Sequence, residues 1–159
     1  MRRSTRLILP LLLTTGLLAG AGAAFAAEPQ ARNLAREEAN RQLVITFYDR
    51  FFNHHEVQQA AKVVADDYKQ HNPEVPNGKA PLVGYFTSFF KENPGSRARI
   101  VRSATDGDLV YLHVHATTGP NDRGQAVVDI FRVKDGQIVE HWDVIQSVPA
   151  KAANDNTMF

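Results

Sequence analysis

The sequence contains no cysteine, and this absence excludes several kinds of chemistry. Without a thiol the chain can form no disulfide, and it has no cysteine for a lipid anchor or for nucleophilic attack. It also lacks a nucleophile elbow, a phosphate-binding loop and a dinucleotide-binding fingerprint. Acid–base chemistry by Asp and His side chains is therefore the mechanism that the sequence supports.

An excess of charge of one sign is lacking as well, because 18 Lys and Arg residues almost balance 17 Asp and Glu residues. Removal of an N-terminal targeting segment with Arg2, Arg3 and Arg6 would shift the formal charge from +1 to about −2. A nucleic-acid-binding protein requires a basic stripe on its surface. The balance of charge thus argues against nucleic acid as a partner.

The long apolar run lies at the N-terminus and predicts a signal peptide over residues 1–26. A basic stretch, residues 1–6, precedes it, and Ala24-Phe25-Ala26 fits the small-x-small cleavage rule. Pro10 and several glycines interrupt the run, so it is a poor membrane span. We expect a periplasmic or secreted protein that makes no membrane contact after cleavage.

The remaining chain, about 130 residues, suffices for one domain with a single core and a small pocket. Its C-terminal end is polar and shows no hydrophobic period, as expected of a loose tail. We expect a signal peptide over 1–26, a leader over 27–36, a domain over 37–148 and a flexible tail over 149–159.

Hydrophobic periodicity predicts helices in the first half of the domain and strands in the second. Apolar residues spaced by three and four predict helices over 36–52, 56–66 and from 81 to about 93. After Gly95 the period changes to two, which predicts strands over 98–105, 109–118, 124–133 and 138–147. This order is typical of an α+β fold in which three N-terminal helices pack on one face of an antiparallel sheet.

The last two strands, VVDIFRVKDGQIVEHWDVIQ over 127–146, form the most informative segment. The turn at Lys134-Asp135-Gly136 suits a three-residue connection with a glycine bulge, which places Asp129 opposite His141. A two-residue loop would instead place Asp129 opposite Trp142. We prefer the bulged register.

Alternation of side chains then divides this hairpin into an ionisable face and an apolar face. The ionisable face carries Val127, Asp129, Phe131, Val139, His141, Asp143 and Ile145. The apolar face carries Val128, Ile130, Arg132, Ile138, Glu140, Trp142 and Val144. A charge that faces a core must be paired, neutralised or put to use, because burial of a bare carboxylate costs many kcal/mol.

The strand VYLHVHATT adds two histidines, His113 and His115, which share one face. If that face is concave, they meet the ionisable residues of the hairpin, and Tyr111 and Phe131 add the aromatic walls typical of ligand sites. The alternative is that these residues form the solvent face of a half-buried sheet. The candidate acid–base residues are Asp129, His141, Asp143, His115 and His113.

The histidines also allow a metal hypothesis, because neutral imidazole suits zinc, copper or iron. His71, in the predicted loop YKQHNP, would be the third ligand beside His113 and His115. The alternative is that His71 is a turn residue after the second helix. The spacing is short and common, so we expect no metal and no other cofactor.

The apolar face of the hairpin requires a cover, since Trp142 lies there with Val128 and Val144. Such a patch predicts a homodimer through the outer sheet face, with Arg132 and Glu140 paired on it. The alternative is that this face packs on the helices and the ionisable face is solvated.

The pattern as a whole resembles the SnoaL-like branch of the nuclear transport factor 2-like superfamily over residues 37–148. The run DIFR-x-x-DG-x-IVEHWDV is the most specific part, supported by YKQHNP and HVHA. The resemblance implies a cone in which the sheet wraps a pocket that the helices close. It also implies that Asp129, Phe131, His141 and Asp143 face into the cone.

Relatives in this superfamily include ketosteroid isomerases, scytalone dehydratases, polyketide cyclases that close rings by aldol condensation, and non-enzymatic binders. Asp129 is similar in position to the aspartate that ketosteroid isomerase keeps neutral as a hydrogen-bond donor. Tyr48 is the candidate for that enzyme's tyrosine. The resemblance implies a pocket for a small apolar or carbonyl-containing ligand, with aldol-type, isomerase or lyase chemistry, or alternatively a non-catalytic periplasmic binding module. The candidate ligand-binding residues are Tyr48, His71, Tyr111 and Phe131.

Overall fold

The computed structural model describes residues 31–159, so the predicted signal peptide lies outside the described residues. Its helices are α1 (Leu34–Phe52), α2 (Val57–Ala60) and α3 (Lys79–Glu92), with a short 3₁₀ helix, η1 (Ala61–Val63), after α2. Its strands are β1 (Val64–Gln70), β2 (Arg97–Asp106), β3 (Leu109–Thr117), β4 (Gln125–Lys134) and β5 (Gln137–Ser147). None of the helices in this part of the chain is long and apolar enough to cross a membrane.

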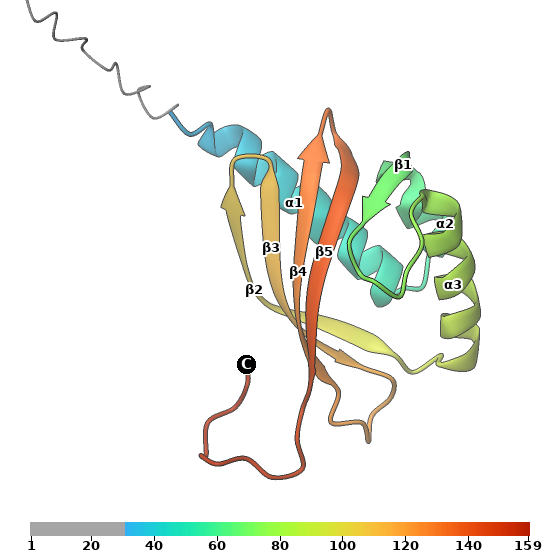
Figure 1. Ribbon diagram of the computed structural model, residues 1–159, viewed down its shortest axis with the longest axis vertical. Coiled ribbons are helices and arrows are strands. Elements are labelled where there is room, and N and C mark those ends of the chain that lie inside the picture. Colours follow the sequence, from blue (N-terminus) through green and yellow to red (C-terminus); the bar gives the residue numbers. More distant parts are fainter. Residues whose placement is uncertain (1–30) are drawn as a thin grey trace, which may run out of the picture. The chain divides into compact units, whose positions relative to one another are not determined.

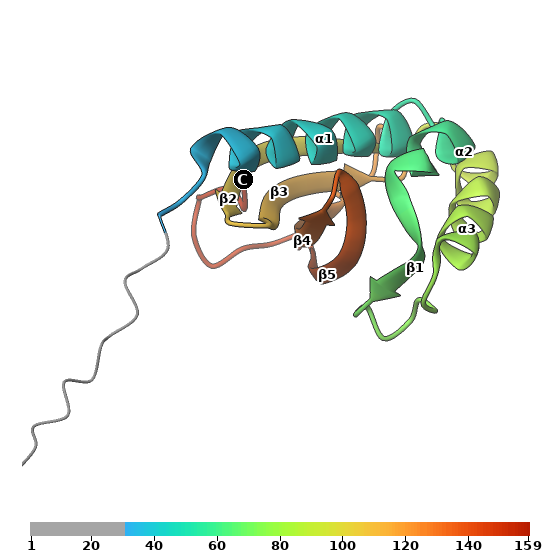
Figure 2. The ribbon, with the colours of Figure 1, turned by 90° about the horizontal axis from the view of Figure 1, so that it is seen from above.

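The strands form one curved five-stranded sheet in the order β1-β5-β4-β3-β2 (Figure 1). Strands β2 to β5 form an antiparallel meander, as predicted, and β1 joins the edge of β5 in parallel. Helix α1 runs along one face of this sheet, and α2 and α3 lie beside β1 at one end (Figure 2). The predicted α+β architecture, with helices on one sheet face, is confirmed.

The second predicted helix, over 56–66, is wrong in its second half. Helix α2 ends at Ala60, and the chain is a strand from Val64, so the predicted loop begins as β1. The burial of Val64, Ala65 and Tyr68 does not alternate along β1. Helix propensity is only a weak preference, and the ladder with a distant strand overrides it here.

The core lies between α1 and the sheet. Val44, Phe47, Tyr48 and Phe51 are buried at the helical spacing that the sequence predicted. They pack with buried residues of the central strands, namely Val110, Leu112, Val114, Phe131 and Val133. Rings from α3 join them, with Phe51 and Phe86 centroids 5.1 Å apart. Polar groups buried in so aromatic an interior require partners.

The hairpin between β4 and β5 has a two-residue loop, because Lys134 pairs with Gln137. Asp135 and Gly136 both have positive φ, 50° and 76°, as a type I′ turn requires. A shift of register then follows, in which Arg132 partners Glu140 while Val133 partners Ile138. The expected three-residue connection is therefore wrong.

This shift makes Val139 an extra residue in β5, and it decides which residues face each other. Asp129 lies opposite Asp143, and Phe131 lies opposite His141. The expected pair of Asp129 with His141 is wrong by two positions, but a shift of two keeps the same face. Ile138, which we expected on the outer face, is fully buried.

The outer face of the hairpin matches the prediction in other respects. Arg132 and Glu140 are paired there, with Arg132 Nε 2.9 Å from Glu140 Oε2. Val128 and Val144 form a cross-strand pair and are 41% and 71% exposed. The homodimer through this face stays a prediction.

The first turn of α1 carries a buried carboxylate, Glu37, that Arg32 and Thr105 bind. The hydrogen bond from Arg32 is the main cause that lowers the pKa of Glu37 from 4.5 to about 2. A lowered pKa stabilises the fold at pH values above 4.5, and this contribution is lost as the pH falls towards 2. We expect the melting temperature of Glu37→Gln to fall less between about pH 6 and pH 3 than that of the wild type. Equal falls in the two proteins would contradict this assignment.

Candidate functional site

The interior contains a buried hydrogen-bonded couple, Asp129 of β4 and His141 of β5. Asp129 is 5% exposed and His141 is 7% exposed. The two lie diagonally across the β4–β5 ladder, and His141 Nε2 is 2.9 Å from Asp129 Oδ1. Both face the helices, as the resemblance implied. Phe131, opposite His141, lies against the imidazole with the ring centroids 4.7 Å apart.

Tyr48 of α1 makes a second hydrogen bond to this carboxylate. Its hydroxyl donates a hydrogen bond to Asp129 Oδ2 over 2.7 Å, and the ring is buried. Burial, and then the charge of Asp129, raises the pKa of Tyr48 well above its ordinary value. Tyr48 therefore remains a hydrogen-bond donor at neutral pH. The sequence offered Tyr48 only as a loose match to the tyrosine of ketosteroid isomerase, and its hydroxyl lies on Asp129.

Gln70, at the end of β1, determines which nitrogen of His141 carries a proton. Its Oε1 accepts the backbone N–H of Asn72 over 2.9 Å, which fixes the orientation of the side-chain amide. The same oxygen lies 3.0 Å from His141 Nδ1. An amide oxygen can only accept, so His141 Nδ1 must be the donor.

One proton therefore lies between His141 Nε2 and Asp129 Oδ1. Either His141 is an imidazolium beside a carboxylate, or a neutral imidazole accepts a hydrogen bond from a carboxylic acid. In both states the couple holds one proton that it could share with a third group. The Asp129–His141 couple is therefore an acid whose orientation the folded protein fixes before a ligand binds.

Asp143 is the member of this cluster that is half-exposed. Asn72 Nδ2 lies 3.0 Å and 2.9 Å from its two carboxylate oxygens. It stands beside the couple, since ligand atoms of Asp129, His141 and Asp143 all lie within 4.8 Å of one another. A carboxylate that an amide orients, and that solvent reaches, can act as a base.

These three residues could hold a cation only at a cost. His141 Nε2 and Asp129 Oδ1 already bond to each other, and Asn72 donates to Asp143. A metal ligated by His141 Nε2 would have to replace the contact of this atom with Asp129 Oδ1. The metal ligands considered from the sequence, namely His71, His113 and His115, are not brought together in residues 31–159.

The placement expected for His113, His115 and Tyr111 is wrong, because all three lie on the outer face of the sheet. The residues between them, Leu112 and Val114, are buried and face the helices. Alternation along a strand forces the neighbours outwards. The apolar residues of this strand were the better guide to its inner face.

Other groups engage these outer histidines. Arg102 Nη1 lies 2.6 Å from His113 Nδ1, and His115 Nε2 lies 2.8 Å from the carbonyl oxygen of Arg123. The ring of Phe159, at the end of the tail, stacks on His115 with centroids 4.2 Å apart. Neither histidine contacts the Asp129–His141 couple.

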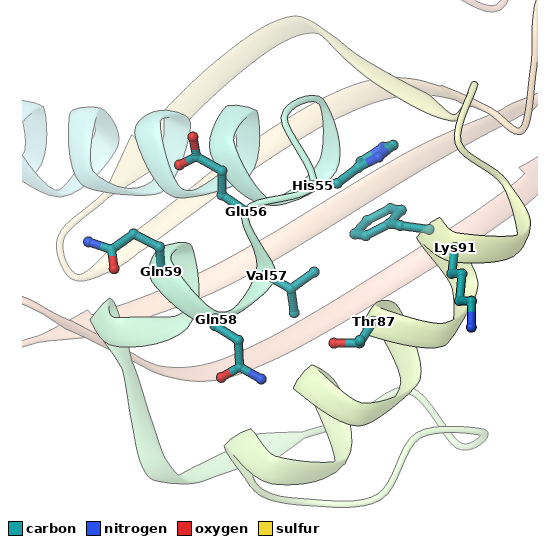
Figure 3. Close-up of a pocket in the computed structure, with 8 residues that line it drawn as sticks. His55, Glu56, Val57, Gln58, Gln59, Thr87 and Lys91 are labelled. Atoms are coloured by element: carbon teal, nitrogen blue, oxygen red, sulfur yellow. The ribbon is translucent and has the colours of Figure 1, made fainter.

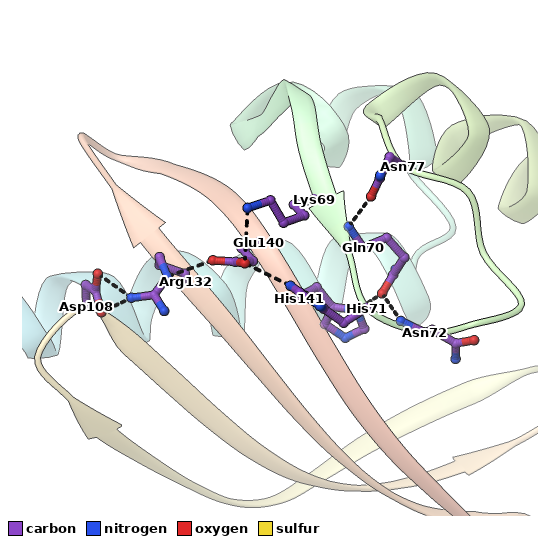
Figure 4. A network of polar contacts seen from close by, with 9 residues as sticks. All are labelled: Lys69, Gln70, His71, Asn72, Asn77, Asp108, Arg132, Glu140 and His141. Carbon is purple, nitrogen blue, oxygen red and sulfur yellow. Dashed lines mark hydrogen bonds and ion pairs between the residues drawn. The ribbon is translucent and has the colours of Figure 1, made fainter.

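His71 also lies on the outer face. It follows β1, and its Nε2 is 2.8 Å from Glu140 Oε1 (Figure 4). Its ring stacks on Trp142 with centroids 4.6 Å apart. His71 therefore does not line the interior, although its neighbours in the sequence, Gln70 and Asn72, contact the site.

Sequence reasoning missed these neighbours, Gln70 and Asn72, and also Tyr68. Tyr68 is buried, and its ring is stacked with that of His141, with the centroids 6.4 Å apart. Its hydroxyl oxygen accepts a hydrogen bond from Gln70 Nε2 over 3.2 Å. The turn-forming residues in and after their motif, YKQHNP, predict a loop, whereas the structure ends a strand there. Because this segment continues strand β1, its side chains alternate between the two faces of the sheet, and Gln70 and Asn72 point inwards.

Two surface depressions lie elsewhere on the protein. The larger, of 540 Å³, is lined by residues of the α1–α2 connection, of α2 and of α3, such as His55, Val57 and Thr87 (Figure 3). The smaller, of 270 Å³, lies between α1 and the segment from Gln59 to Val63. Neither includes a residue of the Asp129–His141–Asp143 cluster. We take the cluster as the candidate site because it alone of the three combines buried ionisable groups with mutual hydrogen bonds.

The chain belongs to the SnoaL-like family, because the model of the SnoaL-like domain matches residues 44–141. This match includes Tyr48, Asp129 and His141 and ends just before Asp143. No curated protein matches the chain significantly.

Solved structures show the same fold. A protein from Kribbella flavida, described provisionally as a ketosteroid isomerase, is 20% identical with a TM-score of 0.61, over 74% of this chain and 85% of that one. A SnoaL-like protein of unknown function from Burkholderia thailandensis is 15% identical with a TM-score of 0.60, over 69% and 98%. An NTF2-like protein of unknown function from Cytophaga hutchinsonii is 15% identical with a TM-score of 0.58, over 67% and 89%. The predicted cone-shaped fold is confirmed, and at such identities the likeness concerns the fold alone.

Proposed function

We propose that this protein binds a small apolar or carbonyl-containing compound and catalyses proton transfer at the carbon next to the carbonyl group. The observation that carries the proposal is the buried chain from Tyr48 through Asp129 to His141, beside the half-exposed carboxylate of Asp143. Enolisation needs a base and a hydrogen-bonding acid at the same place, and this cluster offers both. Membership of the SnoaL-like family is consistent with that chemistry.

In this proposal Asp143 is the base. Its carboxylate removes the α-proton, and the electron pair of the C–H bond moves into the carbonyl group to form an enolate. The oxygen that becomes negative is stabilised by the proton that Asp129 and His141 share. Return of the proton from Asp143 to a different carbon yields an isomer. Alternatively, attack of the enolate on a second carbonyl closes a ring, and the alkoxide that forms takes the proton from Asp143.

The remaining contacts orient these groups. Gln70 holds His141 in one tautomer, and Tyr48 holds Asp129 from the opposite side. The buried rings of Phe131 and Tyr68 line the couple and exclude water. Water exclusion strengthens each hydrogen bond to a developing charge.

The first test uses Asp143→Asn and a small β,γ-unsaturated cyclic ketone. We expect the wild type to accelerate deuterium uptake and double-bond migration, as followed by proton NMR in D₂O. Asp143→Asn keeps the shape and loses the base, so we expect a rate about 10²–10⁴-fold lower. Asp155→Asn, which changes an exposed carboxylate of the tail, is the matched control. Full activity of Asp143→Asn would rule out this base.

One observation favours a second function, a non-catalytic binding module. Both ring nitrogens of His141 and both carboxylate oxygens of Asp129 have partners within the chain, as in a structural network. Thermal stabilisation of the wild type by the ketone, with no deuterium uptake, would support this alternative.

A further inference from the structure

The segment Gln70-His71-Asn72 contacts both faces of the sheet. Gln70 and Asn72 bind the inner residues His141 and Asp143. His71, between them, binds the outer face of the same strand, β5. Because alternate side chains of an extended segment point in opposite directions, these contacts interlock the segment with β5.

The outer contacts of His71 are well defined. Its Nε2 lies 2.8 Å from Glu140 Oε1, and its ring is nearly parallel to that of Trp142, at an angle of 6°. Glu140 also accepts Arg132 Nε, and Asp108 holds Arg132 in turn over 2.8 Å (Figure 4). The hydrogen bond from His71 is the main cause that lowers the pKa of Glu140, so the acceptor stays charged.

Backbone pairing supports this segment over only a short length. The β1–β5 register is interrupted between Val64 and Lys69. Beside the site the ladder consists of Lys69 with Glu140 and Gln70 with His141, and the His71 N–H donates to the His141 carbonyl oxygen over 3.0 Å. A short edge ladder opens easily, so side-chain contacts next to it determine its position.

We propose that His71 is a positioning residue of the acid–base site: its contacts with Glu140 and Trp142 on the outer face hold Gln70 and Asn72 against His141 and Asp143 on the inner face. Its consequence for turnover rests on the proposed function. The positioning itself does not, because it concerns the hydrogen bonds of His141 and can be measured without a substrate.

The test follows the His141 Nδ1 proton by NMR in ¹⁵N-histidine-labelled protein. His71→Leu keeps an apolar contact with Trp142 and removes the donor to Glu140. We expect the Nδ1 proton of His141 to exchange with solvent about tenfold faster, since one net hydrogen bond corresponds to roughly that factor. We also expect the ¹⁵N shifts of His141 to move towards a mixture of tautomers.

Two further variants separate positioning from general destabilisation. His71→Gln restores a donor of similar reach, and we expect it to recover the wild-type shifts and exchange rate. Lys69→Gln removes a charge 3.7 Å from the same Glu140 oxygen without removing a stacked ring, and we expect no change. Dispersed amide spectra check that each variant is folded.

The proposal is overturned if folded His71→Leu keeps the His141 signals of the wild type, or if Lys69→Gln perturbs them equally. If His71→Leu does not fold, His71→Gln decides: wild-type signals support a role for the donor, and altered signals overturn it. Failure of the proposed function would show separately, as unchanged deuterium uptake in Asp143→Asn.

Discussion

Replacement of Asp129 by leucine should cost about 3–5 kcal/mol in the free energy of unfolding, because it strips partners from buried groups. The Tyr48 hydroxyl and His141 Nε2 both bind this carboxylate, at 2.7 Å and 2.9 Å. Leucine offers no hydrogen-bond acceptor to either group, and both Tyr48 and His141 are buried. A buried donor left without a partner is more costly than an average hydrogen bond is stabilising.

Asp129→Asn should behave differently. The asparagine oxygen can accept from Tyr48, and its N–H₂ group can donate to His141 Nε2, because Gln70 keeps the proton on Nδ1. We therefore expect a loss of only about 1 kcal/mol in the free energy of unfolding. The proton shared with His141 is nevertheless gone, so the rate of enolisation should fall about 10²–10⁴-fold.

Urea denaturation and deuterium uptake together measure this separation of stability from activity. Asp155→Asn, which changes an exposed carboxylate of the tail, should change stability by less than about 1 kcal/mol and leave activity intact. If Asp129→Asn destabilised the protein as much as Asp129→Leu, the tautomer assigned to His141 would be wrong.

Most of the fold could be predicted because its periodicities are local. The bounds of helix α1 and of strands β2 to β5 lie within two residues of their predicted bounds, since their apolar residues recur about every 3.6 residues or every two residues. Strand β1 shows no such alternation. Its partner, β5, lies about 70 residues away in the chain, so the information that makes it a strand is long-range.

The residues of the hairpin that share the inner face could be predicted, but the residues that lie opposite each other could not. Asp129, Phe131, His141 and Asp143 share the inner face whether Asp129 lies opposite His141 or opposite Asp143, since the two registers differ by an even number. The bulge at Val139, which nothing in the sequence marks, decides between them. For β3, alternation alone allows two choices of inner face, and the burial of Val110, Leu112 and Val114 decides against the histidines.

Gly124→Ala should be the most damaging single methyl addition among the glycines of the described chain. A Cβ at Gly124 would lie 2.2 Å from the carbonyl oxygen of Ala116, in the neighbouring strand β3, and 2.8 Å from Thr117 Cγ2. The first obstacle is backbone, so a change of rotamer gives no relief. Gly124 also has a φ of +78°, where an alanine is strained.

Hydrogen bonds on both sides prevent the backbone of Gly124 from moving away. Its N–H donates to Asp122 Oδ1 over 2.9 Å, and its carbonyl oxygen accepts the N–H of Val148 over 2.9 Å. We expect Gly124→Ala to lose roughly 2–5 kcal/mol, as the sum of backbone strain and overpacking. Gly107→Ala is the matched control, because Gly107 has a φ of +61° and open space around the added methyl group.

Gly107→Ala should therefore show the backbone strain alone, about 1–2 kcal/mol. Urea denaturation of both variants measures the difference, which isolates the close approach of the β3 carbonyl group. Equal losses in the free energy of unfolding would mean that the β3–β4 connection shifts to accommodate the methyl group at no energetic cost. A larger loss at Gly124 would show that this connection is rigid, and with it the beginning of β4, the strand that carries Asp129.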